Sequence, residues 1–369
     1  MIPVNEPILD GNEEKYLVDC IRSGWISSEG PFVKEFESRF AARVGRRFGV
    51  AVSNGSVALE AAIKALDIGL GDEVIMPTFT IISCAAAVVR QGATPVLVDA
   101  DPLTWNMDVN QIEARISSRT KAILVVHIYG LPTDMAPVLY LAEKCGLKII
   151  EDAAEAHGQT YYDKPCGSFG DISTLSFYPN KHVTTGEGGM ILTDSETLAE
   201  RCRSLRNLCF QPGKRFVHEE LGWNFRMSNL QAALGVAQLE RLDEFVTIKR
   251  RMGARYAGLL NGIPGIQLPL ESTGYADNIY WVYGLVLDDE LSFDGNEAMA
   301  RLNKWGVGTR PFFWPMHEQP IFRKMGMFAG ESHPVAERIA RRGLYLPSGL
   351  ALTDEQIERV ASAVKEIRQ

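Results

Sequence analysis

A lysine near the middle of the chain stands where its amine could bond covalently to a carbonyl carbon. Lys181 follows an apolar stretch and precedes the Gly-rich turn 186–189, and Asp152 ends an earlier apolar run at 147–152. An amine and a strand-end carboxylate are the groups that pyridoxal 5'-phosphate (PLP) requires. The amine forms a Schiff base with the cofactor aldehyde, and the carboxylate keeps the pyridine nitrogen protonated. We therefore predict a PLP site built on Lys181 and Asp152.

A second motif could hold the phosphate of such a cofactor. Residues 54–57 (NGSV) follow a predicted strand and open a predicted helix, whose first N–H groups would face an anion. Gly55 allows close approach of the backbone, and Ser56 and Ser176 could add hydroxyl donors. Taken alone, this junction is more often a simple helix N-cap, and the 186–189 loop is more often a plain turn. Asp152 could instead cap a neighbouring helix. That role is disfavoured when Lys181 and the possible phosphate site at residues 54–57 are considered together with it.

Alternating apolar runs and helical patterns from about residue 46 to 193 must position these groups. Strands are predicted at 48–53, 73–76, 95–98, 121–126 and 147–152, and helices at 57–66, 85–90, 109–116 and 137–144. Because the strand runs are nearly continuously apolar and do not alternate, they predict a mostly parallel central sheet with helices on both faces, an α/β fold. Ligands gather at the carboxyl ends of such strands. Ser53, Pro77, His127 and Asp152 fall at those ends.

The pattern changes after residue 228. Residues 229–260 predict a long connecting helix or a helix pair. Beyond it, a strand at 280–287 and helices at 296–304, 334–342 and 354–368 predict a smaller C-terminal α+β domain. We therefore divide the chain into a large domain, 13–250, and a small domain, 251–369, with the N-terminal arm 1–12 packing near the latter.

The composition of the chain limits the classes of molecule that it is expected to bind. The chain has 369 residues, 46% of them hydrophobic, and a net charge of −8, which argues against nucleic acid or an anionic membrane as main partner. Its six cysteines are scattered without metal-type spacing, so we predict reduced thiols and no metal site. The N-terminus lacks the features of a signal peptide, and no apolar run is long enough to span a membrane. We predict a cytoplasmic protein.

Ordered motifs along nearly the whole chain resemble the DegT/DnrJ/EryC1/StrS sugar aminotransferases. Besides the segments already quoted, they are 25–28 (WISS), 71–74 (GDEV), 77–80 (PTFT), 151–155 (EDAAE), 184–190 (TTGEGGM) and 222–227 (GWNFRM). The resemblance implies a fold type I aminotransferase that uses PLP, with pyridoxamine 5'-phosphate (PMP) as an intermediate form. It also implies L-glutamate as amino donor, a keto-sugar as acceptor and a homodimer with shared active sites.

By position, the resemblance assigns roles to eight residues. Lys181 matches the Schiff-base lysine, Asp152 the partner of the pyridine nitrogen, and Glu155 the position near the ring hydroxyl. Ile81 stands where the family usually has an aromatic residue stacked on the ring. The positions that match phosphate ligands are Ser56, Val57 through its amide, Ser176 and, from the neighbouring subunit, Asn224.

The motifs determine the sugar acceptor less closely than they determine the cofactor and the amino donor. Segments 25–28 and 309–317 are most similar to members that aminate GDP-4-keto-6-deoxy-mannose for O-antigen or other surface polysaccharide. Departures at Ile81, at 178–179 and at 205–211 leave the sugar open to another 3-keto or 4-keto nucleotide sugar. Substrate contacts are predicted for Trp25, His127, Arg226, Arg310, Trp314 and His317. A histidine chosen this way is more often a structural residue with both nitrogens satisfied.

Two other classes of function compete with amino transfer. In one branch of the superfamily a histidine replaces the lysine and the enzyme is a sugar dehydratase, but here His182 only follows Lys181. A non-catalytic PLP-binding regulator is the other alternative. The intact pair of Lys181 and Asp152 argues against it, because a scaffold needs neither group.

Overall fold

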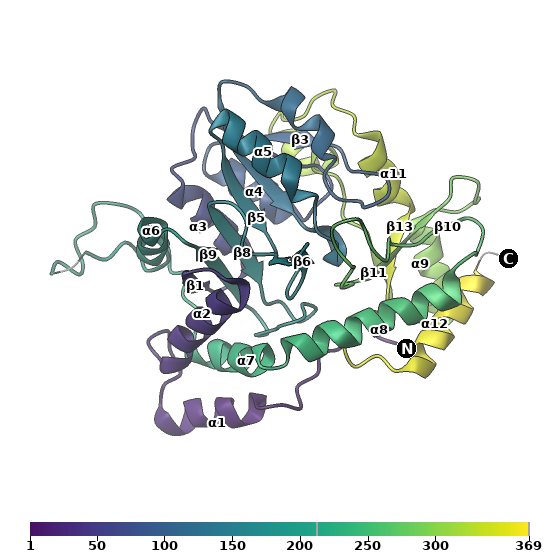
Figure 1. Cartoon of the computed structure of the whole chain (residues 1–369), viewed down its shortest axis with the longest axis horizontal. Helices are drawn as coiled ribbons and strands as arrows, with labels where there is room; N and C mark the ends of the chain where they lie inside the picture. The colour runs from purple at the N-terminus through teal and green to yellow at the C-terminus, as the bar shows by residue number, and fades with distance from the viewer. Residues whose placement is uncertain (212, 368–369) are drawn as a thin grey trace.

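The computed structural model describes residues 1–211 and 213–367. Figure 1 shows a large sheet between helices, a smaller sheet beside it, and a long helix running beneath both. The helices of the described residues are α1 (Glu13–Ser23), α2 (Pro31–Val44), α3 (Gly55–Ala65), α4 (Ile82–Arg90), α5 (Met135–Cys145), α6 (Glu196–Arg206), α7 (Asn229–Leu239), α8 (Leu242–Leu260), α9 (Gly295–Lys304), α10 (Pro320–Lys324), α11 (Pro334–Arg342) and α12 (Asp354–Glu366). The strands are β1 (Phe48–Val52), β2 (Glu73–Pro77), β3 (Thr94–Val98), β4 (Thr120–Val126), β5 (Lys148–Asp152), β6 (Thr160–Tyr161), β7 (Lys164–Pro165), β8 (Ile172–Ser176), β9 (Gly189–Thr193), β10 (Ile266–Gln267), β11 (Tyr283–Leu287), β12 (Arg310–Pro311) and β13 (Gly343–Leu346).

The large sheet confirms the mostly parallel architecture predicted from the sequence. Its strand order is β1-β9-β8-β5-β4-β2-β3, and every neighbouring pair is parallel except the two pairs that involve β9. Because β9 is reversed between β1 and β8, those two strands run in the same direction as the rest. The carboxyl ends of all the other strands therefore lie at one edge of the sheet.

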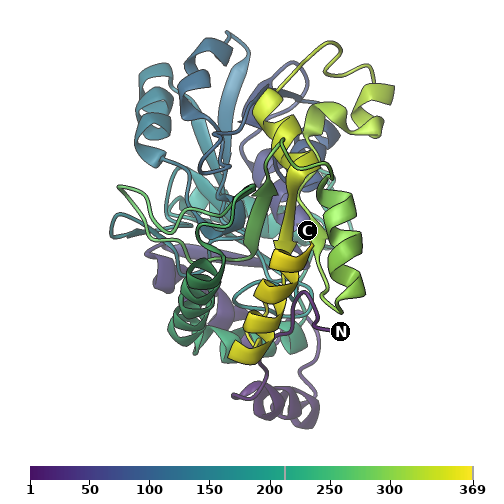
Figure 2. The ribbon, with the colours of Figure 1, turned by 90° about the vertical axis from the view of Figure 1, so that its right-hand side faces the viewer.

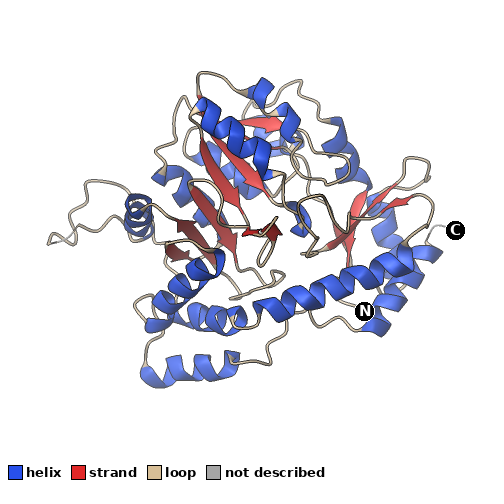
Figure 3. Ribbon diagram, in the orientation of Figure 1, coloured by secondary structure: helices blue, strands red, loops and turns tan. Residues whose placement is uncertain are grey.

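Apolar residues on successive positions of one strand face opposite layers. Val50 and Val52 of β1 belong to the core that α3, α4 and α6 cover, whereas Ala51 belongs to the core beneath α2 and α7. On β4, Ile123 and Val125 pack in a further core with residues of α5. Figure 3 shows these helices on the two sides of the red strands. Burial of both faces is the reason that the strand sequences do not alternate with polar residues.

The prediction of a helix at 109–116 is wrong. Two short 3-10 turns, Val109–Gln111 and Glu113–Arg115, occupy this stretch. The Asp108 carboxylate accepts hydrogen bonds from the backbone and side chain of Asn110 and from the side chain of Gln111. These local bonds offer the backbone an alternative to a helix, which a segment of eight residues is too short to overcome.

The C-terminal part has a separate antiparallel sheet, in the order β10-β11-β13-β12. The connecting helix is a pair, α7 and α8, and the 19-residue α8 runs without a break through the domain boundary predicted at residue 250. The N-terminal arm lies against this part, with Ile2 paired to Val307 and Ser348 donating its N–H to the Val4 carbonyl at 2.8 Å. Figure 2 shows both termini on this side of the molecule. Among the described residues, the helices are too short or too polar to cross a membrane.

A buried carboxylate anchors the end of β5 to the loop that follows it. Glu151 is fully buried and accepts hydrogen bonds from the backbone N–H of Gly167 at 2.6 Å, from that of Phe169 at 2.8 Å and from His127 Nε2 at 2.9 Å. Removing the carboxylate would leave three buried donors without their partner, and each such donor costs about 1–3 kcal/mol.

We therefore expect Glu151→Ala to lower the free energy of unfolding by about 3–5 kcal/mol in urea titrations, because it breaks a buried charged network. Glu143→Ala is the matched control, since this glutamate is exposed on α5, and its effect should stay within about 0.5 kcal/mol. Equal stability of the two variants would contradict the anchoring role of Glu151.

Candidate active site

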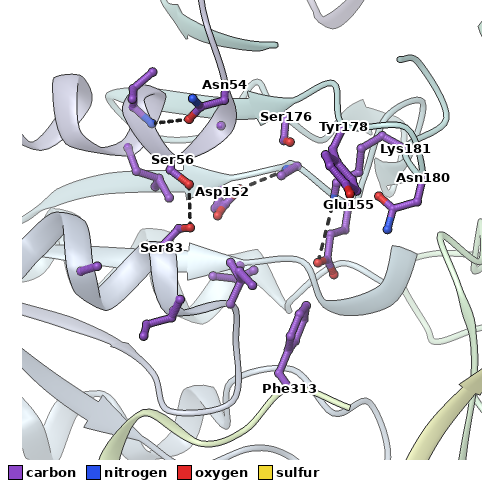
Figure 4. A pocket seen from close by; sticks show the side chains of 18 of the residues that line it. Asn54, Ser56, Ser83, Asp152, Glu155, Ser176, Tyr178, Asn180, Lys181 and Phe313 are labelled. Carbon is purple, nitrogen blue, oxygen red and sulfur yellow. Dashed lines mark hydrogen bonds and ion pairs between the residues drawn. The ribbon is translucent and has the colours of Figure 1, made fainter. Parts of the chain in front are cut away.

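A cavity of about 720 Å³ opens at the edge of the large sheet where the parallel strands end. Its walls come from the first turns of α3 and α4, the ends of β5 and β8, and the loop 178–187. The part of the chain that carries the antiparallel sheet closes another side with Trp281, Phe313 and Tyr345. Figure 4 shows Ser56, Asp152, Ser176 and Lys181 around this one space.

One end of the cavity is the N-terminus of α3. Within the described residues, the backbone N–H groups of Gly55 and Ser56 donate to no other group of the chain, as expected for a first helical turn. Close packing depends on Gly55, because a Cβ there would lie 2.7 Å from the Ser176 Cβ. The Ser56 and Ser83 hydroxyls are 2.7 Å apart. Two free amides and several hydroxyls at a helix N-terminus form a site for a phosphate group.

The amide of Val57, predicted to bind phosphate, already has a partner. It donates to the Oδ1 atom of Asn54, the N-cap of α3, at 3.0 Å. Val57 lines the cavity, but its N–H would have to be shared with that cap. The amides of Gly55 and Ser56 are the better donors.

Lys181 lies across the cavity from this cradle, on the loop after β8. Its Nζ atom is 3.8 Å from Glu155 Oε1 and 3.6 Å from the centre of the Trp281 indole ring. Glu155 Oε2 accepts the N–H of Tyr129 at 2.9 Å. Burial lowers the pKa of Lys181, and burial raises the pKa of Glu155 to about 7. The amine is thus less strongly held in its charged form than a lysine in water, as a nucleophilic lysine requires.

Asp152 ends β5 on the floor of the same cavity. One of its carboxylate oxygens accepts the N–H of Ala154 at 3.1 Å, and the other accepts the thiol of Cys84 at 3.4 Å. Burial raises the pKa of Asp152, and these two donors and the nearby Lys181 oppose the rise. A buried carboxylate with such donors can stay ionised beside a cationic partner.

The whole chain matches proteins of one family. The model of the "DegT/DnrJ/EryC1/StrS aminotransferase family" matches residues 7–365. A GDP-perosamine synthase of Caulobacter vibrioides is 43% identical over 370 residues, covering 99% of this chain and 98% of that protein. A GDP-perosamine synthase of Vibrio cholerae is 40% identical over 365 residues, again covering 99% and 98%. This chain belongs to the DegT/DnrJ/EryC1/StrS aminotransferase family.

The fold agrees with solved structures of sugar aminotransferases. A putative sugar aminotransferase of Streptococcus pneumoniae, solved in a PLP form, superimposes with a TM-score of 0.93 at 25% identity and covers 100% of this chain and 98% of that one. The same protein has been solved in a PMP form. The protein described here is a sugar aminotransferase of a PLP-dependent family. Its cavity fits the cofactor, since it offers an amine, a carboxylate and a phosphate cradle.

Seven of the eight predicted cofactor residues line this cavity, namely Ser56, Val57, Ile81, Asp152, Glu155, Ser176 and Lys181. Asn224 lies outside it, exposed, and bridges to Asn207 on the neighbouring segment. Four of the predicted substrate residues, Trp25, Arg226, Arg310 and Trp314, also lie outside the cavity of their own chain. Arg226 donates to Asn207 Oδ1 at 2.6 Å, and Trp314 lies beside the Arg341 guanidinium.

The histidines predicted to contact substrate are buried instead. His127 bonds to Glu151 through Nε2 and accepts the N–H of Thr133 at its Nδ1 atom. His317 bonds to Thr78 at 2.8 Å and to Glu337 at 3.0 Å. Because both ring nitrogens of each are engaged away from the cavity, their geometry supports a structural role and corrects the prediction.

Other cavity residues were not predicted as ligands. Ser83 is the second residue of α4 and follows the 77–80 motif after Ile81 and Ile82, so its place after a strand end was a usable signal. Asn180 precedes the lysine. Trp281 and Tyr345 come from the small domain, and no spacing in the sequence links them to Lys181.

The raised pKa of Glu155 predicts a pH dependence of stability. The folded protein holds this proton to about pH 7, whereas the ordinary value is 4.5. Between these values the folded state carries more protons than the unfolded chain, so its stability falls as the pH rises. In the cofactor-free protein, we expect Glu155→Gln to reduce this fall by roughly 2 kcal/mol between pH 5 and 7.

Urea titrations at several pH values measure this difference. Glu187→Gln is the matched control, because Glu187 lines the same cavity but is exposed, and it should leave the profile unchanged. A Glu155→Gln profile that parallels the wild-type profile would contradict the burial of a protonated Glu155.

Proposed function

We propose that this enzyme uses PLP to transfer the amino group of L-glutamate to the C4 ketone of GDP-4-keto-6-deoxy-mannose. The product would be GDP-perosamine, a precursor of O-antigen or other surface polysaccharide. The relatives named GDP-perosamine synthase support this acceptor, because they match over almost the full length of both chains. Departures at Ile81 and in segment 205–211 keep another nucleotide-linked 3-keto or 4-keto sugar as the alternative.

One observation carries the proposal of PLP chemistry. The Lys181 amine, the Asp152 carboxylate and the N-terminus of α3 open into a single cavity. Each group suits a different part of the cofactor, namely its aldehyde, its pyridine nitrogen and its phosphate. In our proposal the N–H groups of Gly55 and Ser56 and the hydroxyls of Ser56 and Ser176 bind the phosphate.

When bound, PLP supplies an electron sink for the electrons left behind as a substrate Cα–H bond breaks. The Nζ atom of Lys181, freed by the amino donor, would accept the proton from the substrate Cα and deliver it to the C4′ carbon of the cofactor. Asp152 would hold the pyridine nitrogen in its protonated form through an ion pair in a desolvated site. Glu155, which accepts the N–H of Tyr129, would lie near the ring hydroxyl. Ile81 would pack on the ring without aromatic stacking.

A homodimer completes the site in this proposal. Asn224 is exposed and lies outside the cavity of its own chain, so it is free to reach a second copy. Asn224 of the partner subunit would then bind the phosphate, and Arg226 of the partner subunit would face an anionic part of the substrate. Trp25, Arg310 and Trp314 are proposed to lie near the sugar nucleotide at the rim.

The test is the absorption spectrum of the purified protein with added PLP. A band near ~420 nm should mark the covalent bond to Lys181, and L-glutamate should bleach it with release of 2-oxoglutarate. Lys181→Ala should lose the band and at least ~10⁴-fold in activity. Lys365→Ala, on the exposed face of α12, is the control and should retain both. A wild-type protein without this band, even with excess PLP, would sink the proposal.

The same bleached protein distinguishes the acceptors. Return of the band with GDP-4-keto-6-deoxy-mannose, and with no other sugar of a 3-keto and 4-keto panel, would support the proposed acceptor. Return with another nucleotide sugar alone would replace it. Consumption of a keto-sugar without stoichiometric 2-oxoglutarate would indicate a dehydratase instead.

The phosphate cradle can be tested separately. In Gly55→Ala the new methyl group would lie 2.7 Å from the Ser176 Cβ, so either α3 or Ser176 must move. We expect PLP affinity, measured by absorbance titration of the cofactor-free protein, to fall by about tenfold or more, since several hydrogen bonds to one phosphate lengthen together. Gly258→Ala is the control, because a Cβ there meets nothing within 4 Å. Equal affinities would place the phosphate elsewhere.

A further inference from the structure

Trp281 has no role in the proposed reaction, yet it is the residue whose ring lies against the free lysine amine. The Nζ atom of Lys181 is 3.6 Å from the centre of the indole ring. No hydrogen bond to this amine is present among the described residues, and its nearest carboxylate oxygen, on Glu155, is 3.8 Å away. The amine therefore sits between a π face and a carboxylate.

The ring is fixed from several directions. Its indole N–H donates to the carbonyl of Asn180 at 2.8 Å, which ties the ring to the residue next to Lys181. Its own carbonyl accepts the buried amine of Lys249, in the middle of α8, at 2.8 Å, and that amine also bonds to the Ser348 carbonyl. Tyr129 and Phe313 pack around the ring. Trp281 is 4% exposed, so its place is set by the fold and not by solvent.

We propose that Trp281 is a positioning residue that receives the Lys181 amine whenever the amine is not bonded to the cofactor. This inference rests on the proposed function, since it gives Lys181 the cofactor-anchoring role. The indole face keeps the displaced amine beside the reacting carbon and favours its ammonium form. While the amine is free it exchanges this proton with solvent, so the ring face sets how the amine is divided between its ammonium form, a proton donor, and its neutral form, a proton acceptor.

The physical basis is a cation–π interaction inside a desolvated site. Tryptophan gives the strongest such interaction, and its strength rises when water is excluded. Burial alone lowers the pKa of Lys181, so the ring face opposes that effect and restores part of the charged population. The other ionisable groups around the amine are, from the elements packed against it, Glu155, Asp152, Cys84, His157, His182 and Lys249.

The proposal is tested by titrating Lys181 itself in the full-length protein. Lysine labelled with ¹³C at Cε gives one NMR signal per lysine, and a Lys181→Arg sample identifies the signal of Lys181. We expect Trp281→Leu, which keeps an apolar side chain but has no π face, to move the titration midpoint down by about one pH unit. Trp281→Phe, which keeps a weaker π face, should restore at least half of that shift.

The measurement is made first without cofactor and then with added PMP, which leaves the lysine free. The cofactor-free titration does not depend on PLP chemistry, so it separates failure of this inference from failure of the proposed function. The wild-type absorption spectrum tests the latter. An equal midpoint in Trp281→Leu and wild type, or equal shifts in the leucine and phenylalanine variants, would overturn the role of the ring face.

A second sample allows the same test if the leucine variant does not fold. Protein grown on 5-fluorotryptophan keeps the shape of the indole but has less electron density on its face, which weakens the attraction for a cation. Its Lys181 midpoint should fall in the same direction by a smaller amount. The Trp281→Phe variant grown on the same analogue carries fluorine at all of its remaining tryptophans. Its Lys181 midpoint should equal that of the unlabelled Trp281→Phe variant. A fall of equal size in both samples would also overturn the proposal.

Discussion

The structure depends on keeping several ionisable groups together in a site with little water. Lys181, Glu155 and Asp152 are all at least nine-tenths buried, and a single charge in such a place would cost several kcal/mol. Each carboxylate therefore takes a backbone N–H, Glu155 from Tyr129 and Asp152 from Ala154. Tyr129 is held in a left-handed conformation with φ of 57°, a strained backbone that brings its N–H to the carboxylate.

The two main sheets and the segments around them supply different parts of this environment. The parallel strands of the large sheet deliver polar side chains to one edge, and the first turn of α3 adds free N–H groups there. The part with the antiparallel sheet supplies aromatic surfaces, Trp281, Phe313 and Tyr345, which exclude water from the other side. Exclusion of water strengthens the attraction between the remaining charges and makes the lysine a better nucleophile. The chemistry of the site thus needs the contact between these two parts of the chain.

Sequence reasoning reached the fold class and five of the seven strands of the large sheet, because each of these has a local signature. The cofactor residues that it proposed line one cavity, except Asn224. Predicted runs of four to six residues mark β1, β2 and β5, and the proposed anchoring lysine stands beside a Gly-rich turn. The substrate histidines failed for a physical reason. The position of a histidine at the end of a strand does not show whether its ring faces the cavity or points into the core. The ring of His127 points into the core, toward Glu151. Trp281 could not be predicted from the sequence, because 100 residues separate it from Lys181. Only the packing of the C-terminal part brings its ring into contact with the lysine amine.

The N-terminal arm has a consequence for how the chain is made. Several of its hydrogen-bond partners are synthesised far later than the arm itself, with Val4 joined to Ser348 and Glu6 to Ala351. Asn5, between them, also donates to the carbonyl of Pro179, two residues before the lysine. Domains fold as they emerge from the ribosome, the N-terminal one first. Here residues 4–6 find these partners only when residues 348–351 have been synthesised, so the loop that carries Lys181 gains this support late in the synthesis of residues 1–369.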